Sequence, residues 1–140
     1  MGFASLGSGS SGNATIVALS RSIFLVDCGF KVRTMERRLG QLDISPGDID
    51  AIFITHEHSD HVSGLAGFAH KYNIETFASY GTQKRAFVGV NCSIFDADGP
   101  WVFRRPTRNL VFDSQIQDWQ LVWQLCEMFQ SKPPYYCFVH

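Results

Sequence analysis

The residues best suited to chemistry in this chain are three histidines and an aspartate that lie within six positions. They are spaced His56-x-His58-x-Asp60-His61 and directly follow the apolar run IDAIFIT at residues 49–55. Imidazole nitrogens and carboxylate oxygens are suitable ligands for Zn²⁺, Fe or Mn²⁺. Sites in α/β proteins lie at the carboxyl ends of strands, and an extended backbone would carry His56 and His58 to the same side. The cluster therefore predicts a metal site.

A second pattern with chemical potential is the glycine-rich stretch LGSGSSGN at residues 6–13. It matches G-x-G-x-x-G, and Asp27 lies twenty positions after Gly7, which is the outline of a dinucleotide-binding fingerprint. That fingerprint requires a helix after the last glycine, because the helix N-terminus holds the pyrophosphate. Here the run ATIVAL at 14–19 follows instead and predicts a strand. We therefore interpret the glycines as supplying positive φ angles in a tight loop between strands.

The elements that must position these residues follow from the spacing of apolar side chains. Two β-rich runs at 14–19 and 23–27, separated by a short polar turn, predict a hairpin. Alternating strand and helix patterns along the next part of the chain predict an α/β layered domain. The other expected elements are strands at 3–6, 49–55 and 74–78, and helices at 31–42, 62–72 and 81–87.

Two of these elements carry finer expectations. The strand at 49–55 is apolar enough to be buried on both faces. For the helix at 62–72, Asp60 is expected to be the N-cap. The buried face of that helix is expected to comprise Val62, Leu65, Ala66 and Ala69.

Composition places the chain among ordinary globular proteins. It has 140 residues, 45% hydrophobic and 18% charged, with a formal net charge of −1, so its overall charge gives no support for attraction to nucleic acid or membranes. The chain has no apolar run near the roughly 20 residues of a membrane span, and no signal-peptide pattern. Its four cysteines include no C-x-x-C pair, which favours a reduced setting. We expect a soluble, cytoplasmic protein, and interpret its local clusters of basic residues as solvated faces.

The segment ITHEHSDHVSG at residues 54–64 resembles the metal motif of the metallo-β-lactamase superfamily. The surroundings fit as well: LGSGSSGN follows the first expected strand, and FLVDCGF at 24–30 ends a hairpin strand. The whole set is similar to the nuclease-like bacterial subgroup, which includes exonuclease-type DNA-processing members. The resemblance covers roughly residues 1–88 and implies an α/β fold, the N-terminal half of an αββα sandwich.

The resemblance also implies a centre with two divalent metal ions, most commonly Zn, with Mn or Fe as alternatives. His56 and His58 would belong to one metal site and Asp60 and His61 to the second. Asp27 would support the histidine cluster from behind, as a hydrogen-bond partner of a ligand. The implied chemistry is hydrolysis by a metal-bound hydroxide, and Asp60 would also act as a catalytic residue that orients or deprotonates this water.

The substrate implied by the subgroup is a phosphodiester of DNA or RNA. Superfamily members also hydrolyse thioesters, lactones and lactams, so this preference depends on the subgroup alone. Ser8, Ser10 and Asn13 in the glycine loop are candidates for contacting such a substrate near the metals. The sequence does not identify the metal or the oligomeric state.

Beyond about residue 90 the sequence departs from the family pattern. The family completes its site with a third histidine, a bridging aspartate and a final histidine, all downstream. His70 is expected on the opposite side of its helix from His61, and His140 is the last residue. Asp96, Asp98, Asp113 and Asp118 stand in no recognisable bridging context. Residues 91–140 contain all three tryptophans, and an apolar stripe there predicts a helix over 114–130.

Two hypotheses account for residues 91–140. They are a divergent or non-homologous end produced by truncation, a frameshift or an altered gene, or else a genuine folded segment whose helix covers an exposed sheet. Under the first hypothesis the chain is an incomplete copy of doubtful activity. A non-catalytic metal-binding remnant or interaction protein is then the alternative to a hydrolase. A barrel amidohydrolase also carries H-x-H after a strand, but the early hairpin and the adjoining Asp60 and His61 disfavour it.

Overall fold

The computed structural model describes residues 2–19, 22–78, 80–86 and 92–94. The expected helix at 114–130 lies outside these residues, as does all of the segment 91–140 except 92–94. No helix in the described part of the chain has the length and apolar character needed to cross a bilayer.

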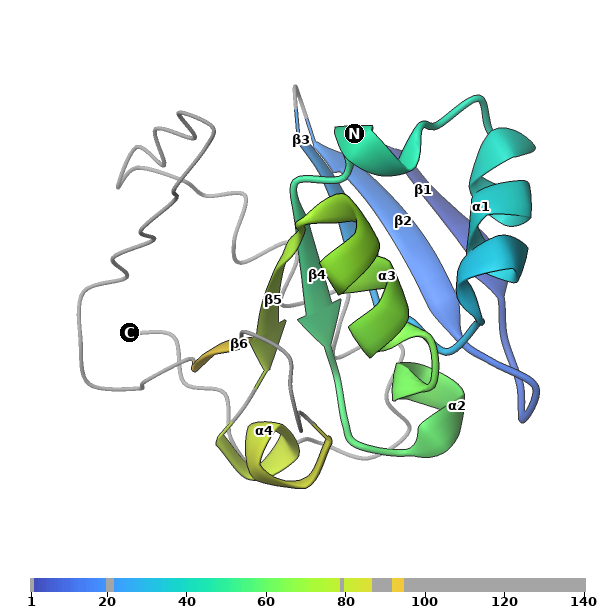
Figure 1. Ribbon diagram of the computed structural model, residues 1–140. Helices are drawn as coiled ribbons and strands as arrows, with labels where there is room; N and C mark the ends of the chain where they lie inside the picture. The colour runs from blue at the N-terminus through green and yellow to red at the C-terminus, as the bar shows by residue number, and fades with distance from the viewer. Residues whose placement is uncertain (1, 20–21, 79, 87–91, 95–140) are drawn as a thin grey trace. The chain divides into compact units, whose positions relative to one another are not determined.

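The described strands form one mixed sheet in which their order in space equals their order in the chain (Figure 1). The first three strands pair antiparallel and the later ones pair parallel. Short connections permit antiparallel pairing, whereas parallel neighbours require a crossover, here made by helices. The strands are β1 (Gly2–Gly7), β2 (Ala14–Leu19), β3 (Ser22–Val26), β4 (Ala51–Ile54), β5 (Glu75–Ala78) and β6 (Cys92–Ile94).

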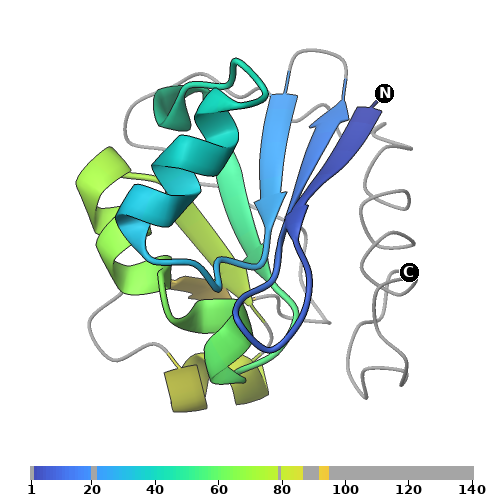
Figure 2. The same ribbon diagram turned by 90° about the vertical axis from the view of Figure 1, so that its right-hand side faces the viewer.

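The helices lie in the crossovers. The α-helices are α1 (Val32–Gly40), α2 (Ser59–Val62), α3 (Leu65–Tyr72) and α4 (Tyr80–Ala86), and a 3₁₀ turn, η1, covers Pro46–Asp48. Figures 1 and 2 show α1 and α3 against the same face of the sheet. Because β3 and β4 are parallel, their carboxyl ends meet at one edge of the sheet.

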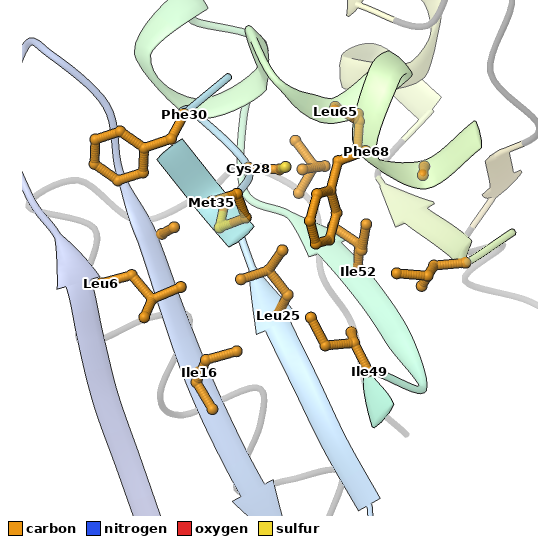
Figure 3. Packing of buried hydrophobic residues seen from close by; sticks show 14 of the residues in the cluster. Leu6, Ile16, Leu25, Cys28, Phe30, Met35, Ile49, Ile52, Leu65 and Phe68 are labelled. Atoms are coloured by element: carbon orange, nitrogen blue, oxygen red, sulfur yellow. The ribbon is translucent and has the colours of Figure 1, made fainter. Parts of the chain in front are cut away.

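The core fills the space between the sheet and these two helices. Figure 3 shows Leu25 and Ile52 pointing from neighbouring strands toward Met35 of α1 and Phe68 of α3. Met35 and Phe68 are fully buried, and burial of a side chain of this size contributes about 1.5–3 kcal/mol. This packing fixes the helices on the sheet and thereby fixes the loops at its carboxyl edge.

The elements predicted from the sequence are largely confirmed. The hairpin, the strand at 3–6, the helix at 31–42 and the strands at 49–55 and 74–78 all appear, with ends shifted by a few residues. The residues of β4 are all buried, as expected. The glycine loop joins two strands, and Gly9 and Gly12 have φ angles of +128° and +142°, as the interpretation of this loop required.

The expectations for residues 60–72 were partly wrong. The chain forms two helices there, and the N-cap of α2 is His58, so Asp60 lies in the first turn of α2 and is not an N-cap. The break falls at Gly64, whose amide donates to the carbonyl of Cys28 (2.9 Å) and where a Cβ would overlap the carbonyl of Phe30. This close contact with residues 28–30 turns the chain out of a continuous helix.

The predicted buried face of this region also needs correction. Leu65 and Ala69 are buried, but Ala66 is exposed and Phe68 takes the core position. Val62 lies in the short helix before the break and is half-buried. Because the helix breaks at residue 64, the apolar spacing that begins at Val62 in α2 does not continue in register through α3.

Candidate metal centre

The segment that carries the predicted ligands, residues 56–61 (the ligand loop), begins beyond the carboxyl end of β4 and includes the start of the short helix α2, which leads to α3 (Figure 1). The imidazole centroids of His56 and His58 are 4.6 Å apart, and those of His56 and His61 are 3.8 Å apart. Oδ2 of Asp60 lies 3.5 Å from Nε2 of His61. The structure therefore brings all four predicted ligands into one cluster.

Asp27 connects this cluster to the end of β3. It adopts φ +60°, a left-handed conformation that aspartate tolerates, and its amide donates to the carbonyl of Phe53 (2.8 Å). Its Oδ1 accepts hydrogen bonds from the amide and the hydroxyl of Thr55, both at 2.9 Å. Its Oδ2 lies 2.7 Å from Nδ1 of His61.

The contact between Asp27 and His61 decides the tautomer of the histidine. A carboxylate accepts hydrogen bonds, so Nδ1 of neutral His61 carries the proton and Nε2 keeps its lone pair. Carboxylate support of the far nitrogen is the usual arrangement for a metal-ligating histidine. Asp27 thus leaves Nε2 of His61 without a proton, which a ligand role for this histidine would require.

Two histidines of the cluster have shifted pKa values, in opposite directions. Burial disfavours the charged form of His61, but the hydrogen bond to Asp27 and the charges of Asp27 and Asp60 raise its pKa. Burial, followed by the neighbouring His61, lowers the pKa of His56. His56 is therefore neutral, and free to bind a cation, at a lower pH than His61 is.

The glycine loop is connected to the same cluster through Asn13. The Asn13 amide N–H donates to the carbonyl of Asp60 (2.7 Å), and the Asn13 side chain pairs with both backbone polar groups of Gly9. Nδ2 of Asn13 also lies 2.8 Å from Oδ2 of Asp60 and 3.1 Å from Nε2 of His61. Ser8 and Ser10, the other candidates in this loop, are exposed.

The short helix α2 packs tightly on the segment after β3. The amide of Cys28 donates to the carbonyl of His61 (2.8 Å), and a Cβ at Gly29 would overlap the carbonyl of Asp60. Burial, with the charge of Asp27, raises the pKa of the Cys28 thiol to about 12, so this sulfur is a core atom rather than a thiolate ligand. The approach of two backbones therefore holds Asp60 and His61 in place.

The Asp60–His61 pair fits a divalent cation. Two ligand atoms bound to one tetrahedral Zn²⁺ at about 2.0–2.2 Å lie roughly 3.4 Å apart, close to the 3.5 Å seen here. No three His, Cys, Asp or Glu side chains among residues 2–19, 22–78, 80–86 and 92–94 converge to hold one ion, although a catalytic zinc ordinarily has three protein ligands. His70 is exposed, but it lies on α3 whereas His61 lies on α2, so the expectation that one helix carries both was wrong.

Two residues in this geometry, Thr55 and Asn13, make contacts that were not expected from the sequence. Thr55 connects Asp27 to the start of the ligand loop, and the side chain of Asn13 contacts Asp60 and His61. The position of Thr55 between a buried strand and the first histidine was a weak indication of its contacts. No sequence feature indicated those of Asn13, because its partners lie 47 and 48 positions away in the chain.

Comparison with known proteins agrees with this geometry. The family model of the metallo-beta-lactamase superfamily matches residues 7–89. The chain is similar to the exodeoxyribonuclease WalJ of Streptococcus pneumoniae (42% identity over 77 residues, 55% of this chain and 29% of the relative). It is also similar to ribonuclease Z of Pediococcus pentosaceus (42% identity over 74 residues, 47% of this chain and 23% of the relative). The matched stretch spans less than a third of each of these relatives.

Solved structures support the fold. The Rm3 metallo-beta-lactamase superposes with a TM-score of 0.59 at 16% identity, over 71% of this chain and 44% of that chain. A metallo-beta-lactamase from Cronobacter sakazakii gives a TM-score of 0.51 at 21% identity, over 57% of this chain and 32% of that chain. The expected N-terminal half of an αββα sandwich is thereby confirmed. The family match, the shared fold and the clustered H-x-H-x-D-H residues show that this chain belongs to the metallo-beta-lactamase superfamily.

Proposed function

We propose that this chain is a metal-dependent hydrolase that cleaves phosphodiester bonds of DNA or RNA. The observation that carries the proposal is the Asp60–His61 pair, spaced for one cation and held in ligand form by Asp27. The nucleic-acid substrate is supported by the relatives, which are named as exodeoxyribonucleases and ribonucleases.

In this proposal, His56 and His58 hold one divalent ion, and Asp60 and His61 hold the other. Bound metal, Zn²⁺ first and Mn²⁺ or Fe as alternatives, would supply Lewis acidity toward the phosphodiester and a lowered pKa for water at the site. Asp27 fixes the tautomer of His61, and Asp60 accepts a proton from the attacking water. The ligands thus come from the first 90 residues, and residues 91–140 are assigned none.

Substrate contact in this proposal falls to the tip of the glycine loop. Ser8 and Ser10 are exposed there, and Asn13 joins the loop to Asp60 and His61. With a net charge of −1 the chain has no general attraction for a polyanion, so we expect recognition to be local. A cytoplasmic location is part of the proposal, because the buried Cys28 is a free thiol.

One observation favours a second candidate, a metal-binding protein without catalytic activity. The described residues bring no three ligands to one ion. A site with two protein ligands per metal binds a cation weakly and leaves it poorly oriented for chemistry. Such a protein would bind metal, or a partner through that metal, without turnover.

The test is to measure metal content and hydrolysis on the same full-length chain. The protein is dialysed against Zn²⁺ or Mn²⁺, bound metal is counted by elemental analysis, and cleavage of end-labelled DNA and RNA is followed. Two ions per chain with cleavage support the hydrolase. Bound metal without cleavage favours the second candidate, and a chain that binds no metal contradicts both.

Substitution of a single ligand sharpens this test. His58→Ala should remove the ion shared with His56, lowering the metal content by at least one ion per chain and abolishing cleavage. His70→Ala is the matched control, because His70 is exposed on α3 and should leave both readouts unchanged. Full metal occupancy in His58→Ala would show that His58 is not a ligand.

A further inference from the structure

The side-chain amide of Asn13 is surrounded by acceptors. Within 3.3 Å of Nδ2 lie Oδ2 of Asp60 (2.8 Å), Nε2 of His61 (3.1 Å), the carbonyl of Gly9 (3.1 Å) and the carbonyl of Asp60 (3.3 Å). The amide has two hydrogens for these four acceptors. Two of the four, on Asp60 and His61, are the atoms whose spacing fits a cation.

Nε2 of His61 can have only one partner at a time. Asp27 accepts the Nδ1 hydrogen, so Nε2 of the neutral ring has a single lone pair. If that lone pair accepts a hydrogen bond from Asn13, it is not available to a metal ion. The carboxylate of Asp60 differs, because its additional lone pairs allow it to accept from Asn13 and bind a cation together.

We propose that Asn13 caps the ligand atom of His61 in the metal-free protein and gives up this hydrogen bond when a divalent cation binds. In the metal-free protein one Nδ2 hydrogen is donated to Gly9, and the other is shared between Oδ2 of Asp60 and Nε2 of His61. When metal binds, Asn13 keeps its contacts with Gly9 and Asp60, so only the share donated to Nε2 is exchanged for the metal. The inference depends on the proposed metal site at Asp60 and His61, and it assigns Asn13 a role that is not substrate contact.

The proposed exchange predicts the direction in which loss of the Asn13 contact changes the metal affinity. A contact that exists only in the metal-free protein competes with the metal, so its removal tightens metal binding. The contacts that Asn13 keeps in both states cancel from the affinity, even where they stabilise the fold. A net neutral hydrogen bond is worth a factor of about 2 to 10 in an equilibrium constant, which is the gain in Zn²⁺ affinity expected for Asn13→Ala.

The experiment compares the Zn²⁺ affinity of the wild-type chain, Asn13→Ala and Ser11→Ala by competition with a chelating dye. It is run at alkaline pH, where His61 is neutral. Ser11→Ala is the matched control, because Ser11 is exposed in the same loop and its substitution leaves the Asn13 donors intact. Tighter binding in Asn13→Ala but not in Ser11→Ala supports the exchange. Unchanged or weaker binding in Asn13→Ala overturns it.

A second measurement needs no variant and covers the case in which Asn13→Ala does not fold. In ¹⁵N-labelled wild-type protein, Zn²⁺ should shift both the Nε2 resonance of His61 and the side-chain NH₂ resonances of Asn13. A shift of Nε2 with an unmoved Asn13 NH₂ overturns the exchange but leaves the proposed metal site standing. A wild-type chain that binds no Zn²⁺ overturns both.

Discussion

At the residue scale, the contact with the greatest chemical consequence is that between Asp27 and His61. The carboxylate accepts from Thr55 through Oδ1 and faces Nδ1 of His61 at 2.7 Å through Oδ2. It therefore binds the backbone immediately before the ligand loop and sets the tautomer of His61 at the same time. Asp27 reaches this position by taking a left-handed conformation at the end of β3.

Asp27→Asn should weaken Zn²⁺ binding by about 10- to 100-fold, because the side chain that supports the ligand loses its charge. Asparagine tolerates the left-handed conformation, so the backbone is preserved. Asp43→Asn is the matched control, since Asp43 has a similar φ of +55° and is exposed. Isothermal titration with Zn²⁺ measures both variants. An equal loss of Zn²⁺ affinity in Asp27→Asn and Asp43→Asn would show that the effect does not come from the contact between Asp27 and His61.

The same pair predicts how the stability of the metal-free protein depends on pH. Asp27 helps to raise the pKa of His61, against the effect of burial, so protonation favours the folded state. This stabilisation is present in full below the unfolded pKa of about 6.5 and is lost as the pH rises through the higher folded pKa. Urea unfolding of wild type and Asp27→Asn should therefore differ more at acid pH than above the folded pKa of His61. A difference that grows with pH would contradict the pairing.

At the element scale, the ligand loop is held by backbones in direct contact as well as by side chains. Gly29 lies against the carbonyl of Asp60, and Gly64 lies against the carbonyl of Phe30. These contacts place α2 on the segment after β3 and end it after four residues. The short helix is therefore a consequence of packing and not of the local helix propensity of residues 59–72.

Gly64→Ala should destabilise the protein by about 3 kcal/mol, because its Cβ would overlap the Phe30 carbonyl and force two backbones apart. Gly40→Ala is the matched control at the end of α1, where a Cβ meets nothing within 4 Å. It should be neutral or stabilising by up to about 1 kcal/mol, since alanine favours helix. Urea unfolding of both variants tests this, and equal effects would show that the contact at Gly64 yields easily.

At the scale of the whole described fold, the sheet brings residues that are distant in sequence together at one of its edges. The connection between β1 and β2 supplies Asn13, the end of β3 supplies Asp27, and the segment after β4 supplies His61. The core between the sheet and α1 and α3 fixes these three segments relative to one another. A cation bound at Asp60 and His61 would add a further connection between them.

Zn²⁺ should therefore raise the melting temperature of the full chain, and a chelator should reverse the rise. Free Zn²⁺ at one hundred times its Kd adds about 2.7 kcal/mol to the stability of a folded state that alone binds it. Mg²⁺ is the control, because it prefers oxygen ligands and should give a much smaller shift. Thermal unfolding followed by circular dichroism measures both ions. Equal shifts would indicate nonspecific binding to surface carboxylates.

The sequence by itself determined the features that depend on neighbours along the chain. The hairpin, the order of strands and helices and the clustering of His56 to His61 all follow from local spacing. The family resemblance rested on short motifs within residues 1–88 and was confirmed by the match to residues 7–89. These predictions succeeded because apolar periodicity and a ligand cluster of six residues are properties of short segments.

Only the tertiary structure decided the features that depend on contacts between distant segments. The break at Gly64, the exposure of Ala66 and the burial of Phe68 follow from packing against residues 28–30 and the sheet. The inward direction of Asn13 follows from hydrogen bonds to partners 47 and 48 positions away. The spacing of residues within one segment does not specify which distant backbone will pack against that segment. The contacts of His61 with Asp27 and Asn13 therefore depend on the sheet, which brings their strands to one edge.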